Sequence, residues 1–210
     1  DLHPRVRRQR QMCIRDRIVG IWDQTIQTGR TPQGLYYGTE YTEEMINAAL
    51  RSEDPLQIVP SVDTDGHGTF VASAAAGGAE VGKRFLGAAP EASIAMVKLK
   101  PAKNYLKEFF AIAQDAVCYQ ENDIMLGLRY LNDLARKQGM PLVICVALGT
   151  SFGGHNGDSL LADILNIYAT VRNRCVVVGT GNEAARRHHY FNRFTDAQDM
   201  RTAEIRVGEG

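Results

Sequence analysis

Four short apolar runs, set apart by longer segments with helical spacing, constrain the fold of this chain more than any other feature. The runs are rich in valine and isoleucine and are too short to form helices alone, which favours buried β-strands. They occupy residues 17–23, 92–100, 141–149 and 174–182. Strands that alternate with helices are typical of a mostly parallel sheet with helices on both faces, so we expect an α/β fold.

The segments between these runs carry the signals that begin and end helices. Residues 122–141, 158–174 and 42–52 place apolar side chains three and four positions apart, as the buried face of a helix requires. Gly139 marks the end of the first of these helices, since glycine is favoured just past a helix C-terminus. The expected N-cap residues are Asn122, Ser159 and Thr42.

The first 17 residues differ from the rest of the chain. They carry six arginines and no apolar periodicity, and they lack the apolar core of a signal peptide. Residues 1–3 and 7–17 match the in-frame translation of a transposon adapter used to prepare sequencing libraries. We therefore interpret residues 1–17 as a disordered artefact, exclude them from fold reasoning, and expect the remaining chain to be a fragment.

The composition of the remainder excludes several function classes. Removing the six arginines and two aspartates of residues 1–17 from the 24 basic and 24 acidic residues leaves 18 and 22, a formal charge of −4. This acidic balance disfavours nucleic-acid binding, and no apolar run approaches the roughly 18 residues of a membrane span. The length suits one compact domain or a large part of one.

Outside the adapter-like segment the chain has three cysteines, Cys118, Cys145 and Cys175. No two of them form a C-x-x-C pair, so neither a zinc site nor a thioredoxin-like motif is expected. Two of them lie within apolar runs, which predicts buried free thiols in strands.

Polar residues collect where the predicted strands end. Asp23 closes the first run, Gly149 the third and Asn182 the fourth. In parallel sheets the carboxyl ends of strands carry the functional residues. Residues 65–73, "DGHGTFVAS", place His67 between glycines at the start of an expected buried helix of small residues. That setting clears space for a substrate and suits a general base.

Taken together, these features resemble the subtilisin-like serine proteases across nearly all of residues 18–183. The shared order is an acid closing a strand, G-H-G-T, the G-x-A-P-x-A turn at residues 87–92, "ALG" after a third strand and "GTGN" after a fourth. The resemblance implies a subtilisin-like sheet that is incomplete at its C-terminal end. It also implies that residues 18–210 form the N-terminal part of a subtilase catalytic domain.

The resemblance assigns a catalytic role to three residues. Asp23 corresponds to the triad aspartate, which orients the imidazole of His67 and stabilises its protonated form. Asn182 corresponds to the oxyanion-hole asparagine, whose side-chain N–H faces the charge that develops on the scissile carbonyl.

Of two further stretches, one matches the family pattern and the other departs from it. Ala147, Leu148 and Gly149 correspond to the segment that pairs with the backbone of an extended peptide substrate. Gln24 and Thr25 stand where the family has a small residue followed by glycine, so the chain departs from the family pattern directly after the aspartate.

The nucleophilic serine of the triad has no counterpart in the 210 residues. Ser151 lies in a G-T-S tripeptide like that of the family, but we reject it because it precedes Asn182 and a turn-rich loop follows it. Ser73 and Ser159 are better explained as helix residues. No serine follows Asn182, so we expect the nucleophile outside this fragment and the fragment itself to be inactive.

Longer strings, "WDQTIQTG", "YGTEYT", "KLKPAKNYL" and "ENDIMLGLRYL", narrow the resemblance to clostridial subtilases that include the germination-specific Csp-type proteases of spores. That group implies a serine endopeptidase for limited proteolysis, notably of a spore cortex-lytic proenzyme. The alternative is a non-catalytic pseudoprotease that senses a germination signal or binds a protein. Some members carry an inserted jelly-roll domain, which makes residues 202–210 a candidate for its first strand.

The expected partners are a protein or peptide substrate and a cleaved propeptide, with no nucleic acid and no membrane. No cofactor and no metal are expected. His188 and His189 are interpreted as part of a polar loop, because adjacent residues on a strand would face opposite sides and make a poor metal pair. The resemblance places the protein in the spore or the cytoplasm, with secretion as the alternative.

Overall fold

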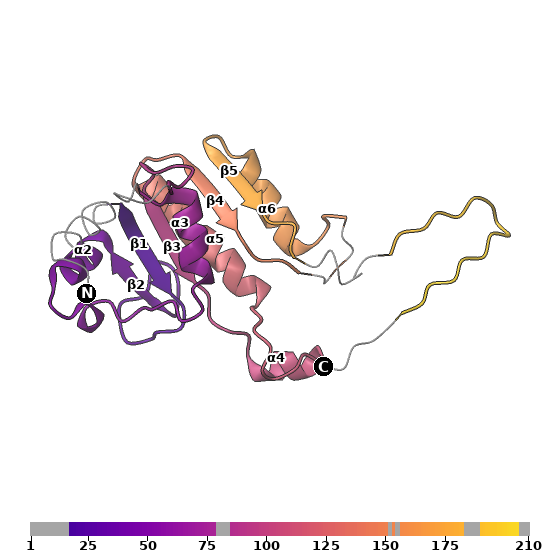
Figure 1. Cartoon of the computed structure of the whole chain (residues 1–210), viewed down its shortest axis with the longest axis horizontal. Helices are drawn as coiled ribbons and strands as arrows, with labels where there is room; N and C mark the ends of the chain where they lie inside the picture. The colour runs from indigo at the N-terminus through magenta and orange to yellow at the C-terminus, as the bar shows by residue number, and fades with distance from the viewer. Residues whose placement is uncertain (1–16, 79–84, 151–152, 154–155, 183–189, 206–210) are drawn as a thin grey trace. The chain divides into compact units, whose positions relative to one another are not determined.

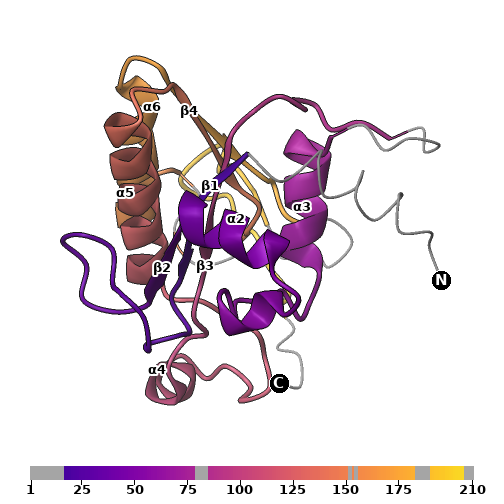
Figure 2. The same ribbon diagram turned by 90° about the vertical axis from the view of Figure 1, so that its left-hand side faces the viewer.

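The structure of the chain is a computed structural model, shown in Figures 1 and 2. It describes residues 17–78, 85–150, 153, 156–182 and 190–205. The chain divides into two compact units. The first comprises residues 1–101 and 118–142, and the second comprises residues 102–117 and 143–210. We expected residues 1–17 to be disordered. Residues 1–16 of this segment lie outside the described residues, whereas Arg17 is described.

The sheet of the first unit has three strands in the order β2-β1-β3. β1 (Ile18–Asp23) and β3 (Ile94–Lys98) run parallel, and the first two apolar runs predicted both. β2 (Thr39–Thr42) pairs antiparallel with the other edge of β1. The sequence did not predict β2, because its four residues contain no apolar run. This sheet is therefore mixed, whereas we expected a mostly parallel one.

Helices cover both faces of this sheet, as predicted, and Figure 2 shows its strands between α5 and α3. Successive side chains of a strand point to opposite faces. On β3, Val97 lies against Gly127 of α5 (Glu121–Lys137). The next side chain back, Met96, borders a cavity beside α3 (His67–Ala76). The two helices therefore pack on opposite faces of the same strand.

The core of the first unit lies between the sheet and α5. Trp22, Leu35 and Tyr130 are buried there, and the ring centroids of Trp22 and Tyr130 are 5.7 Å apart. Gly20 allows α5 to come this close, since a Cβ at that position would lie only 2.8 Å from the Tyr130 hydroxyl. Another helix of this unit, α2 (Glu43–Arg51), packs against β1 and β2. The 3-10 helix η1 (Pro55–Gln57) follows it.

The predicted helix boundaries hold with one correction. Thr42 occupies the N-cap position of α2, although its side chain accepts no capping hydrogen bond. Gly139 has a φ of 67° just past α5, the left-handed conformation that ends a helix. The prediction for Asn122 was wrong, because α5 begins at Glu121 with Gln120 in the N-cap position, which places Asn122 inside the first turn.

The second unit contains a pair of strands, which the third and fourth apolar runs predicted. β4 (Leu142–Val146), whose first residue lies at the unit boundary, pairs with β5 (Arg174–Val178). The backbone N–H of Gly179, just after β5, donates a 3.1 Å hydrogen bond to the carbonyl of Val146 at the end of β4. The carboxyl ends of the two strands therefore meet, as in a parallel pair. The described strands thus form two small sheets.

The described part of the second unit also contains two helices. α6 (Leu160–Thr170) packs against β5, and Ser159 caps it as predicted by accepting a 3.2 Å hydrogen bond from the Ala162 N–H. α4 (Asn104–Phe109) was not predicted. Residues 202–205, the described part of the candidate jelly-roll strand, form no strand.

The prediction of buried strand thiols was wrong. Cys145 and Cys175 are exposed free cysteines, and Cys118 is partly exposed. On β4 the buried residues are Ile144 and Val146, so the alternation of the strand turns Cys145 to the opposite face. Within the part of the chain that the structure describes, that face is open to solvent.

Candidate active site

Asp23 ends β1 with a side chain that is fully buried. Its Oδ1 accepts hydrogen bonds from the backbone N–H of Thr25 at 2.8 Å and from the Thr25 hydroxyl at 2.5 Å. Its Oδ2 accepts from the Ser61 hydroxyl at 2.6 Å and lies 3.4 Å from Nζ of Lys98. Both oxygens of the carboxylate are therefore bonded. Thr25 directly follows β1, Ser61 lies in the segment before α3, and Lys98 ends β3.

These contacts decide the charge of Asp23. Burial by itself raises the pKa of a carboxyl group, because it disfavours the charged form. The hydrogen bonds from Ser61 and Thr25, with the positive charge of Lys98, outweigh burial and lower the pKa of Asp23 below its usual value. The carboxylate is therefore ionised at neutral pH. Burial and the charge of Asp23 together raise the pKa of Tyr41.

Gln24 explains the departure from the family pattern after the aspartate. Its side chain is fully buried, and its Nε2 donates a 3.0 Å hydrogen bond to the carbonyl of Asp123 in the first turn of α5. Its Oε1 accepts a 3.2 Å hydrogen bond from the backbone N–H of Lys100, just past β3. A small residue could not span these groups, so here a long amide fixes the end of β1 to two neighbouring elements.

His67 is the first residue of α3, directly after Gly66, whose φ of 87° sets the turn into the helix. The predicted helix start is confirmed, but the prediction that this helix is buried was wrong. His67 is exposed, and Ala76 is the residue of α3 that is buried. The small side chains of α3 bury little area against the sheet, so most of the helix remains in contact with solvent.

Asp23 and His67 lie in the same unit, but no hydrogen bond joins them in the described structure. The side-chain donors to the Asp23 carboxylate are Thr25, Ser61 and Lys98. The role of Asp23 in orienting the imidazole therefore stays a prediction.

Asp63 was missed by the sequence analysis. Its Oδ1 accepts a 2.8 Å hydrogen bond from the Gly66 N–H, and its Oδ2 accepts from the N–H and the hydroxyl of Thr69 at 2.8 and 2.7 Å. These bonds lower the pKa of Asp63 to about 2. An aspartate three residues before a glycine in the N-cap position is a capping signal, which could have identified it.

The second unit brings together the other predicted site residues. Residues 147–149 follow β4, and Asn182 lies four residues after β5. The backbones approach closely, since a Cβ on Gly149 would lie 3.6 Å from Cα of Gly181. Ala147 and Leu148 are partly buried, whereas Gly149 and Asn182 are exposed. Ser151 lies outside the described residues.

Comparison with known proteins identifies the family. The sequence model of the Subtilase family, Peptidase_S8, matches residues 15–203. The chain belongs to the subtilase family.

The solved structure of the Clostridium perfringens CspB protease is similar to this subtilase chain, with 34% sequence identity and a TM-score of 0.63. The match covers 80% of this chain and 31% of the CspB chain, so the present sequence spans about a third of that protein's length. A comparison with curated protein sequences gave no match.

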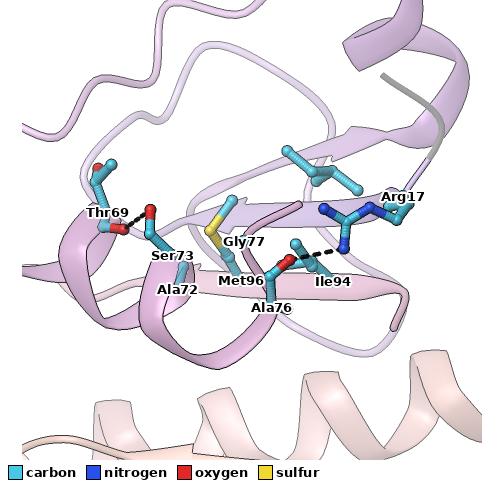
Figure 3. Close-up of a pocket in the computed structure, with 9 residues that line it drawn as sticks. Arg17, Thr69, Ala72, Ser73, Ala76, Gly77, Ile94 and Met96 are labelled. Carbon is cyan, nitrogen blue, oxygen red and sulfur yellow. Dashed lines mark hydrogen bonds between the residues drawn. The ribbon is translucent and has the colours of Figure 1, made fainter. Parts of the chain in front are cut away.

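A cavity of about 160 Å³ lies between α3 and the sheet of the first unit of this subtilase (Figure 3). Its walls are mostly apolar and include Ala72, Ile94 and Met96. The Ser73 hydroxyl at its rim donates a 2.7 Å hydrogen bond to the Thr69 carbonyl one turn earlier, which agrees with our rejection of Ser73 as a nucleophile. The cavity is a packing gap under small helix residues.

Arg17 also lines this cavity, although it is the last residue of the adapter-like segment. Its Nη1 donates a 2.7 Å hydrogen bond to the carbonyl of Ala76 at the end of α3 (Figure 3). It also donates a 3.2 Å bond to the carbonyl of Ala92. A guanidinium at a helix C-terminus satisfies a carbonyl that has no partner within the helix.

No group of three His, Cys, Asp or Glu side chains that could hold a metal ion occurs among the described residues. In the same part of the chain, no helix is long and apolar enough to cross a membrane. His188 and His189, interpreted as a polar loop, lie outside the described residues.

Proposed function

We propose that this chain is the N-terminal part of a serine endopeptidase that hydrolyses peptide bonds with a Ser-His-Asp triad. The observation that carries the proposal is the buried and ionised carboxylate of Asp23 at the carboxyl end of β1. A protein buries such a charge only where donors compensate it, and perturbed buried carboxylates concentrate at functional sites. Membership of the subtilase family supplies the reaction class.

In this mechanism His67 accepts the proton of the serine hydroxyl as the serine oxygen attacks the scissile carbonyl. Asp23 stabilises the imidazolium that results, and His67 then gives the proton to the leaving amine. The Asn182 side-chain N–H stabilises the oxyanion of the tetrahedral intermediate. Residues 147–149 pair with the extended substrate backbone, for which their position directly after a strand is suited.

The nucleophile of this proposal lies in sequence beyond the 210 residues. No serine follows Asn182 here, whereas the family serine follows the oxyanion asparagine. The short span of this chain relative to the CspB structure supports the same conclusion. By itself the 210-residue chain is then inactive.

For the substrate we propose a spore cortex-lytic proenzyme, activated by limited proteolysis in the spore. The similarity to the Clostridium perfringens CspB protease supports this choice over general protein degradation.

A second function, a non-catalytic pseudoprotease that senses a germination signal or binds a protein, is favoured by one observation. The Asp23 carboxylate is already engaged by Ser61, Thr25 and Lys98, and it makes no hydrogen bond to His67 within the described structure.

The deciding experiment is to read the gene beyond codon 210 and to assay the longer product on a fluorogenic peptide and with a fluorophosphonate probe. The peptidase proposal expects a Gly-Thr-Ser followed by Met or Ala, probe labelling at that serine, and hydrolysis that His67→Ala lowers by roughly 10⁶-fold, as for the triad histidine of subtilisin. His188→Ala is the matched control and should retain activity. A longer product with the serine replaced and no labelling would establish the pseudoprotease instead.

A further inference from the structure

We propose that Ser61 and Asp63 are positioning residues that form a clasp, holding His67 in register with Asp23. The clasp is defined by the Ser61 hydroxyl on the Asp23 carboxylate and by the Asp63 carboxylate on Gly66 and Thr69. The proposal rests on the proposed function, because it concerns the geometry of the triad base.

The first point of the clasp joins the loop before α3 to the triad aspartate. Ser61 donates a 2.6 Å hydrogen bond to Oδ2 of Asp23 across 38 positions of sequence. The acceptor is fully buried and ionised, and hydrogen bonds to a charged acceptor are about twice as strong as neutral ones. This bond therefore fixes the start of the loop to the end of β1.

The second point joins the same loop to the start of α3. Asp63 accepts from the backbone N–H groups on both sides of His67, that of Gly66 at 2.8 Å and that of Thr69 at 2.8 Å. The Thr69 hydroxyl adds a third bond at 2.7 Å. The N-cap residue itself is Gly66, which has no side chain to cap the helix, so Asp63 takes over this function from three residues upstream.

Burial cannot hold this segment in place. Residues 62–70 are all exposed, and α3 buries only Ala76 among its residues. An exposed loop without apolar contacts keeps its conformational freedom unless polar bonds remove it. Together with the 3.2 Å bond from the His67 N–H to the Asp65 carboxylate, the four hydrogen bonds of Ser61 and Asp63 therefore set the path of the chain from Ser61 to His67.

The two points are coupled because only Val62 separates Ser61 from Asp63. If the Asp23 carboxylate shifts, its hydrogen bond moves Ser61 with it. Asp63, two residues later, then moves the backbone of Gly66 and Thr69, on either side of His67. Asp63 acts on His67 through Gly66 and Thr69 and needs no contact with the imidazole.

The test uses the 210-residue chain and, in parallel, the longer gene product. In the chain, amide hydrogen exchange of Gly66 and Thr69 and the imidazole NMR signals of His67 are compared between Asp63→Ala and the control Asp54→Ala. Asp54 is another exposed loop aspartate, and it accepts a hydrogen bond from Gln57. The clasp predicts exchange at least tenfold faster at Gly66 and Thr69, with shifted His67 signals, in Asp63→Ala only.

The Ser61 point is tested in the same way. Ser61→Ala should shift the His67 signals, Ser61→Thr should restore them because it keeps the hydroxyl, and Ser52→Ala is the matched control. Unchanged His67 signals in both Ser61→Ala and Asp63→Ala would overturn the clasp. Since Ser61→Thr keeps the bonding pattern, it remains informative if an alanine variant does not fold.

In the longer product, the clasp predicts that Ser61→Ala and Asp63→Ala lower kcat about tenfold or more with KM little changed. Full kcat in both variants, in an enzyme that His67→Ala inactivates, would also overturn it. If the longer product shows no hydrolysis at all, the proposed function fails, and the exchange and NMR results on the chain still decide the clasp.

Discussion

The strand end that carries Asp23 and the strand ends that lead to Asn182 are built in different ways. Trp22, Asp23 and Gln24 at the end of β1 are all completely buried, and side-chain hydrogen bonds fix both polar residues. In the second unit Val178 is 49% exposed and Asn182 is exposed. There the strand ends are joined by backbone contacts, such as the bond from Gly179 to Val146.

The difference agrees with the groups that the proposed mechanism assigns to each strand end. An ionised carboxylate needs donors around it, because a buried charge without partners is strongly unfavourable. The amide donor and the backbone segment that the proposed mechanism assigns to the second unit carry no charge, so the geometry of two paired strands suffices to place them. We therefore expect substitutions near Asp23 to have larger effects than matched substitutions in the second unit.

The largest effect is expected for Asp23→Asn in the longer gene product. Loss of the negative charge removes the stabilisation of the imidazolium, and we expect kcat to fall by about 10⁴-fold. Steady-state hydrolysis of a fluorogenic peptide measures the change. A fall of less than tenfold would show that Asp23 is not the triad aspartate and would remove the contrast between the two strand ends.

Trp22→Ala should destabilise the first unit by about 3–5 kcal/mol, because it leaves a cavity beside Tyr130 in the buried core. Val177→Ala, at a position in β5 that is 51% exposed, is the counterpart in the second unit and should change stability by less than about 0.5 kcal/mol. Urea unfolding of the 210-residue chain compares the two. Equal losses would contradict the difference in packing described above.

Asn182→Ala in the longer product should lower kcat by about 10²–10³-fold with little change in KM, since the lost N–H acts on the transition state. The effect is smaller than that of Asp23→Asn because other donors share the oxyanion. Parallel assays of the two variants rank them. The reverse order would mean that the second unit contributes more to catalysis than the first.

The smallest effect concerns acid sensitivity. The pKa of Asp23 is lowered in the folded chain from a usual value of 3.8. A carboxyl with a lowered folded pKa contributes stability above its unfolded pKa, and that contribution is lost as the pH falls through the folded pKa. The urea midpoint of unfolding should therefore fall as the pH drops below about 4. Ser61→Ala should make this fall smaller, because it removes one of the hydrogen bonds that lower the pKa of Asp23. If the unfolding midpoint depended on pH in the same way in the unsubstituted chain and in Ser61→Ala, the result would argue against the hydrogen bond from Ser61 to Asp23.

The parts of the fold that local patterns encode were predictable. The four apolar runs gave β1, β3, β4 and β5, and the helical spacing gave α2, α5 and α6. β2 and α4 were not predictable, because four polar-rich residues and a helix of six residues are too short to carry a periodic signal. For the site, the motif around His67 and the strand ends at Asp23 and Asn182 were recognisable, whereas Ser61 was not, because its partner lies 38 residues away.

The sequence by itself determined the order of the longer strands and helices and the candidate residues Asp23, His67 and Asn182, since these depend on neighbours along the chain. Only the tertiary structure decided which groups surround Asp23 and which thiols are exposed. The carboxylate is held by Ser61 and Lys98 from separate elements, and Cys145 faces solvent because β4 turns it away from Ile144. Burial and the pKa shifts that follow from it depend on residues brought together from distant positions, which no local pattern records.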